Sequence, residues 1–266
     1  MKIIKSPRLW IFGIPLLLAG WSLFIEPHWL ETTYTTIKTN KVRLPCRIVV
    51  VSDIQTTRLG RYEKAVLRKA VAMKPDIILF TGDYLQINSL DDESVKEFNE
   101  YLRKIRLHAI LGVYAVEGNN EKAGWPKLFA GLDVKTNPKV MDYYAGGITI
   151  TTGDAVRWSV AEINKTKVKG YRIVMTHFPD IALEKVNADL IIAGHTHGGQ
   201  VRIPFFGPLI TLSAIPRAWS AGLTKLPAGN LLYVSRGIGM ERGWAPPVRF
   251  NCRPELAVID LLPGGN

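Results

Sequence analysis

The chain has 266 residues, of which 47% are hydrophobic, and it carries a formal net charge of +11. This length and apolar content suit one folded domain with a substantial core, and they exclude a disordered chain. The positive charge favours a partner rich in phosphate, such as nucleic acid, anionic lipid or a phosphorylated small molecule. The two cysteines, Cys46 and Cys252, are widely spaced and indicate neither a zinc ribbon nor a disulfide framework.

The N-terminal segment is the first predicted element. The stretch from Leu9 to Ile25 has no charged residue and has a tryptophan towards each end. As a helix it would span about 25 Å, close to the thickness of a thin hydrocarbon core. We therefore expect a membrane anchor helix within residues 1–30, with a signal peptide and an interfacial helix as the alternatives. Basic residues lie on both flanks, so the positive-inside rule gives only a faint preference for an internal N-terminus.

Residues 31–45 are polar and rich in threonine, and they predict a linker or an initial edge strand that leads into a domain at 46–266. The first half of that domain alternates apolar β-branched runs with helical stripes. Strands are predicted at 46–53, 76–83 and 108–120, with helices within 61–76 and 92–104. This β-α-β-α-β order implies parallel strands joined by right-handed crossovers.

The second half is less regular. Short strands are predicted at 146–152, 171–177, 188–195, 231–237 and 255–261, with one helix at Asp180 to Val186. Strands and helices mixed on this scale indicate an α/β fold in which two sheets pack together and helices lie outside.

Five of the apolar runs end in the same way, with a polar side chain that suits a metal ion. These residues are Asp53, Asp83, Asn119, His177 and the pair His195 and His197. The carboxyl ends of neighbouring strands in an open α/β sheet meet at one edge, where such folds place their sites. Asp and Asn also begin turns, but five such endings together indicate a metal centre.

The mixture of ligands indicates the kind of metal. Oxygen from Asp and Asn beside nitrogen from His, without a thiolate, fits Mn²⁺, Fe or Zn²⁺ and disfavours Cu(I) and iron–sulfur clusters. About seven protein ligands are more than one tetrahedral ion accepts. Two divalent ions are therefore expected, with Asp83 as a carboxylate able to bridge them.

In order and type, these motifs resemble those of the calcineurin-like binuclear metallophosphoesterases, whose pattern is D-x-H, GD, GN-H-[DE], H and GHxH. The corresponding segments are Asp53-Ile54-Gln55, Gly82-Asp83, Gly118-Asn119-Asn120-Glu121, His177 and Gly194-His195-Thr196-His197. The match covers about residues 47–262, and GHTHGGQVRIPFFGP with YVSRGIG resembles the bacterial membrane-associated branch that hydrolyses phosphodiesters.

The resemblance implies a four-layer αββα sandwich and a metal-dependent phosphoesterase at the bacterial inner membrane, as a single-pass or peripheral protein. It also implies the two ligand sets. The first ion would bind Asp53, Gln55, Asp83 and His197, and the second would bind Asp83, Asn119, His177 and His195.

Two residues depart from the family pattern. Gln55 stands where histidine is usual, and its neutral, harder amide oxygen favours Mn²⁺ or Mg²⁺ over Zn²⁺ or Fe, with loss of the first ion as the alternative. Asn120 stands where a histidine usually protonates the leaving oxygen, and an amide cannot transfer a proton at neutral pH. An alkoxide leaving group would suffer from that loss, whereas a phosphate leaving group would not. Asn120 is therefore only a weak catalytic candidate, and a pyrophosphate is the expected substrate class.

An apolar run follows the histidine pair, at 203–219, and is either a contact for an acyl chain or an ordinary sheet-packing segment. Together with the expected anchor, this run suggests that the substrate is a phosphorylated, lipid-linked small molecule. The resemblance implies UDP-2,3-diacylglucosamine pyrophosphatase activity in lipid A synthesis, with UMP and lipid X as products. A broader phosphodiesterase and a non-catalytic phosphate or nucleic-acid binder are the alternatives; nucleic acid is not the expected partner. The favoured candidates for phosphate contacts are Arg58 and Arg236. Arg202, Arg242 and Arg249 are further candidates.

Overall fold

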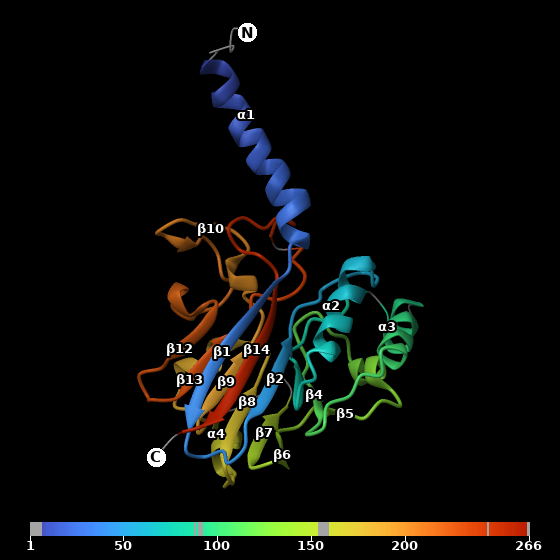
Figure 1. Ribbon diagram of the computed structural model, residues 1–266, viewed down its shortest axis with the longest axis vertical. Coiled ribbons are helices and arrows are strands. Elements are labelled where there is room, and N and C mark those ends of the chain that lie inside the picture. Colours follow the sequence, from blue (N-terminus) through green and yellow to red (C-terminus); the bar gives the residue numbers. More distant parts are fainter. Residues whose placement is uncertain (1–6, 88, 90–92, 154–159, 244, 265–266) are drawn as a thin grey trace.

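The computed structural model describes residues 7–87, 89, 93–153, 160–243 and 245–264, with side chains described from residue 13 onward. Two six-stranded sheets form the body of the protein (Figure 1). The first sheet has the order β1 (Glu31–Thr39), β14 (Glu255–Pro263), β2 (Cys46–Val51), β3 (Ile77–Phe80), β4 (Val113–Ala115) and β5 (Val134–Thr136). The second has the order β12 (Gly222–Lys225), β13 (Leu231–Val234), β9 (Leu190–Ala193), β8 (Tyr171–Met175), β7 (Ile148–Thr152) and β6 (Met141–Ala145).

The β-branched run of β2 shows why the sheets are buried on both faces. Side chains alternate along a strand, so Ile48 and Val50 point to one face while Val49 and Val51 point to the other. The first pair joins a core cluster that contains residues of both sheets, including Ile150 and Ile192. The second pair joins a cluster with residues of the helices α2 (Arg61–Ala72) and α3 (Glu93–Lys104). The two sheets therefore face each other, with helices outside the first sheet.

The outer face of the second sheet has its own core cluster. Val174 and Ile191 pack there with Ile163 of α4 (Val160–Lys165) and Ala182 of the 3₁₀ helix η4 (Pro179–Leu183). The segment predicted as a helix at Asp180 to Val186 is thus a shorter 3₁₀ helix. The mixed α/β architecture with two packed sheets is confirmed. The remaining short elements are η3 (Trp125–Phe129), η5 (His197–Gly199), η6 (Arg217–Trp219) and the hairpin of β10 (Arg202–Ile203) and β11 (Gly207–Pro208).

The parallel arrangement predicted for the first half is confirmed. Strands β2, β3 and β4 pair in parallel, joined through α2 and α3. The predicted start of the second helix, Asp92, lies outside the described residues. The C-terminal strand β14 differs from its neighbours, because it inserts between β1 and β2 and runs antiparallel to β2.

The segment predicted as a linker or an edge strand, 31–45, belongs to the domain in its first part. β1 pairs in parallel with the whole of β14, from Glu31 opposite Glu255 to Thr39 opposite Pro263. Thr33 also donates a 2.6 Å hydrogen bond to the buried carboxylate of Glu255. Of the two alternatives, the edge strand is therefore the one found for Glu31–Thr39, and a threonine-rich stretch suits an edge strand when a partner strand is available.

The N-terminal helix α1 (Pro7–Gly20) continues through a π-helical turn, η1 (Trp21–Ile25), and a 3₁₀ turn, η2 (Glu26–His28). It projects from one end of the body (Figure 1). Among the residues that the structure describes, none of the helices combines the length and the apolar character required to cross a membrane. The predicted membrane-spanning helix within 1–30 is thus not confirmed, and residues 1–6 of that range lie outside the described part.

Candidate metal centre

The predicted ligands come together at one end of the two sheets. Asp53, Asp83 and Asn119 follow β2, β3 and β4 of the first sheet, while His177 and the pair His195 and His197 follow β8 and β9 of the second. Contacts across the sheets include the backbone N–H of His195, which donates to Asp53 Oδ1 at 2.9 Å, and His177 Nε2, which lies 3.5 Å from Asp83 Oδ2.

Strained backbone accompanies this convergence. The φ angles are 48° at Asp53, 54° at Asp83 and 68° at His195, in the left-handed region that non-glycine residues seldom adopt. Each of these residues lies in the loop that follows a strand, two or three residues after the strand ends. Such strain persists where the surroundings fix it, and it clusters at functional sites.

One half of the centre consists of lone pairs that face one another. Asn119 Oδ1 lies 2.8 Å from both His177 Nε2 and His195 Nδ1, and those two nitrogens are 3.2 Å apart. The opposite ring nitrogens, His177 Nδ1 and His195 Nε2, contact the carbonyl oxygens of Thr81 at 2.9 Å and Leu212 at 3.0 Å. Because a carbonyl oxygen only accepts, the ring nitrogens that face it carry the hydrogens. When each ring carries only this one proton, its lone pair faces the Asn119 oxygen, an arrangement that a cation would satisfy.

The other half of the centre is fully buried. One ligand atom from each of Asp53, Asp83 and His197 lies within 4.8 Å of the others, and all three side chains are buried. Gln55 lies beside them, with its backbone N–H donating to the carbonyl oxygen of Asp83 at 2.9 Å. Its side-chain Nε2 donates to Glu241 at 2.7 Å, which leaves the buried Oε1 without a hydrogen-bond partner. An unsatisfied buried amide oxygen among carboxylates fits a hard cation as its partner.

The electrostatics of the centre also favour cations. Burial, reinforced by the nearby charge of Asp83, raises the pKa of Asp53 to about 6. The same two causes raise the pKa of Glu121 to about 8. Burial and then the Arg249 charge hold the pKa of His197 well below its usual value, so this ring is neutral and available as a ligand. Three carboxyl groups in one place, of which Asp53 and Asp83 are buried, repel one another unless protons or metal ions neutralise them.

Binding of Mn²⁺ is expected to tighten at least about tenfold between about pH 5 and pH 7, because a proton on Asp53 competes with the ion. The pKa of Asp53 is raised to about 6 in the folded protein, so the folded state holds more protons than the unfolded state and the metal-free protein loses stability as the pH rises from about 4 to about 6. Calorimetric titration with Mn²⁺ at several pH values measures the first effect. An affinity that does not change with pH would contradict this role of Asp53.

Asn120 has a structural role that its position in the motif did not predict. Its backbone N–H donates to Asp83 Oδ1 at 2.9 Å, and its side-chain Nδ2 donates to Asp83 Oδ2 at 2.7 Å. Both carboxylate oxygens are thereby oriented by one residue. Glu121 completes the support by accepting backbone hydrogen bonds from Asp83, Tyr84 and Gly118, at 2.9, 2.7 and 2.6 Å.

Sequence reasoning missed Glu121, although it is the acidic letter of the motif, and missed Glu241, which no local pattern marks. Arg249 was named as a phosphate contact, but the structure corrects this. Its side chain is completely buried and donates to the carbonyl oxygens of Arg236, Gly239 and Cys252. It thus holds together the loop that follows β13.

The other arginines differ in their surroundings. Arg58 pairs with Glu97 at 2.7 Å, and Arg236 pairs with Glu31 at 2.7 Å. Arg202 donates to the carbonyl oxygen of Gly198. Arg242 is exposed and donates to the carbonyl oxygen of Gln55 at 2.9 Å, so it contacts a candidate ligand residue directly.

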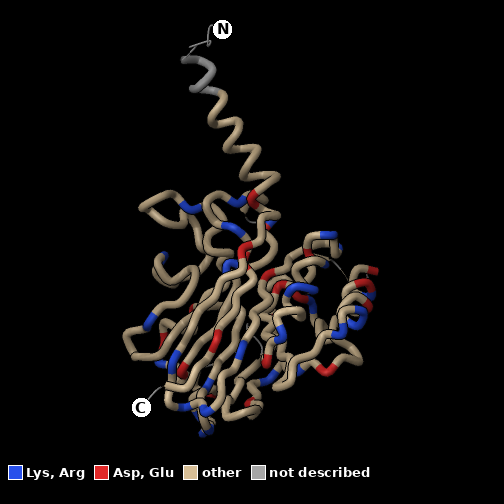
Figure 2. The backbone as a smooth tube through the Cα atoms, in the orientation of Figure 1, with Lys and Arg blue, Asp and Glu red and all other residues tan. Residues whose placement is uncertain are grey.

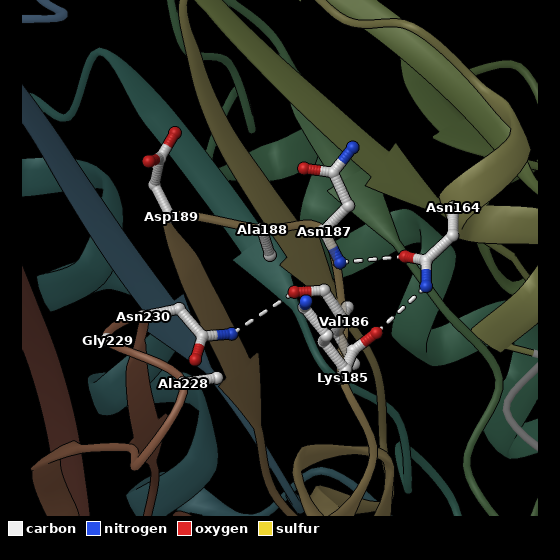
Figure 3. A pocket seen from close by; sticks show the side chains of 9 residues that line it. All are labelled: Asn164, Lys185, Val186, Asn187, Ala188, Asp189, Ala228, Gly229 and Asn230. Carbon is white, nitrogen blue, oxygen red and sulfur yellow. Dashed lines mark hydrogen bonds between the residues drawn. The ribbon is translucent and has the colours of Figure 1, made fainter.

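Two cavities lie at opposite ends of β9. A cavity of about 160 Å³ adjoins His195 and His197 and is otherwise lined mainly by apolar side chains, among them Leu209, Leu212 and Val248. A larger cavity of about 660 Å³ lies where β9 begins, beside Asp189 (Figure 3).

The polar side chains of the larger cavity mainly support loops. Asn164 Nδ2 donates to the carbonyl oxygen of Lys185 at 2.8 Å, and Asn230 Nδ2 donates to that of Val186 at 3.3 Å. The converging ligands are at the other end of the strand. The smaller cavity is therefore the one that adjoins the candidate chemistry.

Comparison with known proteins identifies the family. The model of the calcineurin-like phosphoesterases matches residues 46–199, more than half of the 266-residue chain. The metallophosphoesterase YkuE of Bacillus subtilis is 29% identical over 91% of this chain and 89% of its own. The phosphodiesterase YaeI of Escherichia coli is 26% identical over 91% of this chain and 92% of its own. The UDP-2,3-diacylglucosamine pyrophosphatase LpxG of Chlamydia trachomatis is 25% identical over 95% of both chains.

Each of these three relatives matches more than nine tenths of this chain. The alternative of a non-catalytic binder is not retained. The chain belongs to the calcineurin-like phosphoesterase family and is a metal-dependent phosphoesterase.

Proposed function

We propose that this enzyme hydrolyses a pyrophosphate or phosphodiester bond of a phosphorylated, lipid-linked small molecule, with UDP-2,3-diacylglucosamine as the best candidate. The observation that carries the proposal is the convergence of Asn119 Oδ1, His177 Nε2 and His195 Nδ1, with Asp83 3.5 Å from His177. Such a set of lone pairs serves a cation rather than the protein's own hydrogen bonding.

Two divalent ions fit the residues present. The second ion would take the set just described, and the first would take Asp53, Asp83, His197 and the unpartnered oxygen of Gln55. When bound, the ions would activate water and neutralise charge on the phosphoryl oxygens. Oxygen ligands, including the amide oxygens, outnumber imidazoles, so Mn²⁺ is favoured, with Mg²⁺, Fe and Zn²⁺ as alternatives.

The chain's own residues hold this centre in place. Asn120 fixes both oxygens of Asp83, so the carboxylate is oriented to lie between the two ligand sets. The carbonyl oxygens of Thr81 and Leu212 fix the orientation of the two histidine rings. Hydrogen bonds that orient metal ligands in this way are typically worth 10- to 100-fold in metal affinity or activity.

The preference for pyrophosphate rests on Asn120. Its side chain cannot supply a proton, and its Nδ2 is engaged with Asp83. A leaving group that departs as a phosphate needs no general acid, whereas an alkoxide does. The apolar cavity beside His195 supports a substrate with a hydrocarbon part. The relatives YaeI and LpxG are named as a phosphodiesterase and as a UDP-2,3-diacylglucosamine pyrophosphatase, which is consistent with either bond.

The proposed substrate leads to a proposed location. A lipid A precursor lies in the bacterial inner membrane, so we propose that the enzyme works at the cytoplasmic face of that membrane as a single-pass or peripheral protein, releasing UMP and lipid X. A reporter fused to the C-terminus tests this orientation, and an external reporter would contradict hydrolysis of a cytosolic UDP-lipid.

The substrate class is tested with purified, Mn²⁺-loaded protein on three substrates. UDP-2,3-diacylglucosamine should exceed a dialkyl phosphodiester by at least about 10²-fold in kcat/KM, because a general acid typically contributes that much to alkoxide departure. Bis-p-nitrophenyl phosphate, with its acidic leaving group, should also be turned over. Turnover of bis-p-nitrophenyl phosphate without turnover of the UDP-lipid would indicate a broad phosphodiesterase instead. Equal kcat/KM values for the UDP-lipid and the dialkyl diester would contradict the role given to Asn120.

A further inference from the structure

The end of the molecule that carries the metal centre also carries a large exposed apolar surface, here called the apolar end surface. One part is the hairpin of β10 and β11 with residues 209–212 after it, where Phe205 is fully exposed and Ile210 is 62% exposed. The other part is the N-terminal helical segment, where Leu16 and Leu17 are each 75% exposed. The exposed large side chains are Ile203, Phe205, Phe206, Leu209, Ile210 and Leu212 in the hairpin part, with Ile14, Leu16, Leu17, Leu18, Leu23, Phe24 and Ile25 in the helical part.

The two parts form one surface. Trp21 and Trp29 of the N-terminal segment line a cavity of about 440 Å³ together with Pro204 of the hairpin. The hairpin lies beside the base of α1 (Figure 1). The buried Glu26 fixes this base to the body, since it accepts hydrogen bonds from Trp21 Nε1, at 2.9 Å, and from the backbone N–H of Cys252. The apolar end surface is therefore held in a defined orientation with respect to the domain.

The exposed side chains of α1 require an apolar environment. Leu16, Leu17 and Leu18 are consecutive and all exposed, so they lie on different sides of the helix. A helix that is hydrophobic all round is buried in lipid or in protein rather than in water. Exposed apolar patches of this extent mark interaction sites.

Aromatic rings and cations at the rim favour a lipid surface as the partner. The guanidinium of Arg217 lies over the ring of Phe206 at 5.1 Å, and that of Arg253 lies over Trp29 at 4.3 Å. Figure 2 shows Lys and Arg residues around the hairpin and the base of α1. Tryptophans at a membrane boundary and cations that meet anionic headgroups are typical of surfaces that rest on a bilayer. A second copy of this chain would bring the same cations face to face.

We propose that the apolar end surface docks on an anionic lipid bilayer, with Phe205 and Phe206 at the hairpin tip entering the boundary between headgroups and acyl chains beside α1. The hairpin part is directly connected to the metal centre, because Leu212 supplies the carbonyl oxygen that accepts from His195 Nε2. Docking would place the apolar cavity beside His195 at the membrane surface. A lipid-linked substrate would then enter this cavity from the plane of the bilayer. Only this consequence rests on the proposed function.

The test uses the full chain with an environment-sensitive fluorophore on Phe205→Cys. The native cysteines, Cys46 and Cys252, are buried, so labelling is directed to the new thiol. The matched control is Tyr144→Cys on β6, at the opposite end of the molecule, where Tyr144 is 64% exposed. Vesicles containing phosphatidylglycerol should shift the emission of the label at 205 to the blue and make it accessible to a quencher attached to the lipid chains, whereas the label at 144 should not respond.

Affinity supplies the second measurement. Replacing Phe205 and Phe206 together by serine should weaken binding to those vesicles at least ~10-fold, because two large apolar side chains no longer enter lipid. The control pair Tyr144→Ser and Ile110→Ser, at the opposite end, should leave binding unchanged. Turnover of bis-p-nitrophenyl phosphate should be the same in all these proteins, so a failure of docking is distinguishable from a failure of the proposed function.

Two outcomes would overturn the proposal. A label at 205 that stays in water while the protein floats with vesicles would show that the hairpin does not enter lipid. A blue shift that follows protein concentration in lipid-free buffer, with a matching rise in sedimenting mass, would assign the surface to a second copy of the chain.

Discussion

The Asp83→Ala variant is expected to lose at least about 10³-fold in kcat while it remains folded. Removal of a ligand shared by two ions should exceed the 10- to 100-fold effect of removing a residue that only orients a ligand. Asp83 is buried beside Asp53 and His197, and its Oδ2 lies 3.5 Å from His177. Asp83 therefore contacts both halves of the centre. Turnover of bis-p-nitrophenyl phosphate at saturating Mn²⁺ measures the loss.

The fold of this variant is checked by its thermal unfolding in the absence of metal. Removing one of three clustered carboxyl groups also removes repulsion, so the metal-free variant should unfold at a temperature close to that of the metal-free parent. Asp133→Ala is the matched control, since that carboxylate is 79% exposed and pairs with Lys135 at the surface. Full activity of a folded Asp83→Ala protein would remove the dinuclear mechanism.

The Gly118→Ala variant should damage both the fold and the centre, although it adds only a single methyl group. A Cβ at this position would collide with the Oδ1 and backbone nitrogen of Asp83 and with the carboxylate of Glu121. Neither Asp83 nor Glu121 can move without breaking the hydrogen bonds that hold the centre. We expect a loss of about 1–3 kcal/mol in the free energy of unfolding, as for other overpacked sites, and a fall of at least about 10²-fold in kcat, as for displaced catalytic groups.

Denaturant unfolding and kcat at saturating metal measure these two effects separately. Gly20→Ala is the matched control, because nothing lies within 4 Å of its added Cβ and helical backbone tolerates alanine. Unchanged stability and activity in Gly118→Ala would show that the packing of Asp83 against this glycine is not required.

The metal ligands could be predicted from the sequence because their signal is local. Each one ends an apolar run, as Asp53 does after the strand β2, and the parallel order of β2, β3 and β4 brings these ends to one edge. The parallel order itself follows from the alternation of strand and helix. The same reasoning could not assign β14 to the first sheet, because its antiparallel pairing with β2 joins residues some 210 positions apart and leaves no pattern within either segment.

The supporting residues were missed for a related physical reason. Glu241 binds the Gln55 side chain, and the buried Arg249 organises a loop through backbone carbonyl oxygens. Both depend on tertiary contacts, so neither has a spacing that distinguishes it from a surface charge. Asn120 was identified as a departure from the family pattern, but its hydrogen bonds to Asp83 depend on the geometry of the turn after β4. The N-terminal segment shows the limit of hydropathy, which recognises an apolar run but not where its helix changes to π and 3₁₀ turns.

The most direct test of the account is the metal content of the purified protein after it is loaded with Mn²⁺ and freed of excess ion. The ligand sets of Asp53, Gln55, Asp83 and His197 and of Asp83, Asn119, His177 and His195 predict about two ions per chain. The Asp83→Ala variant should retain fewer than about one. A folded parent protein that binds no ion, or the same content in the parent and in Asp83→Ala, would contradict the assignment of this cluster as a dinuclear centre.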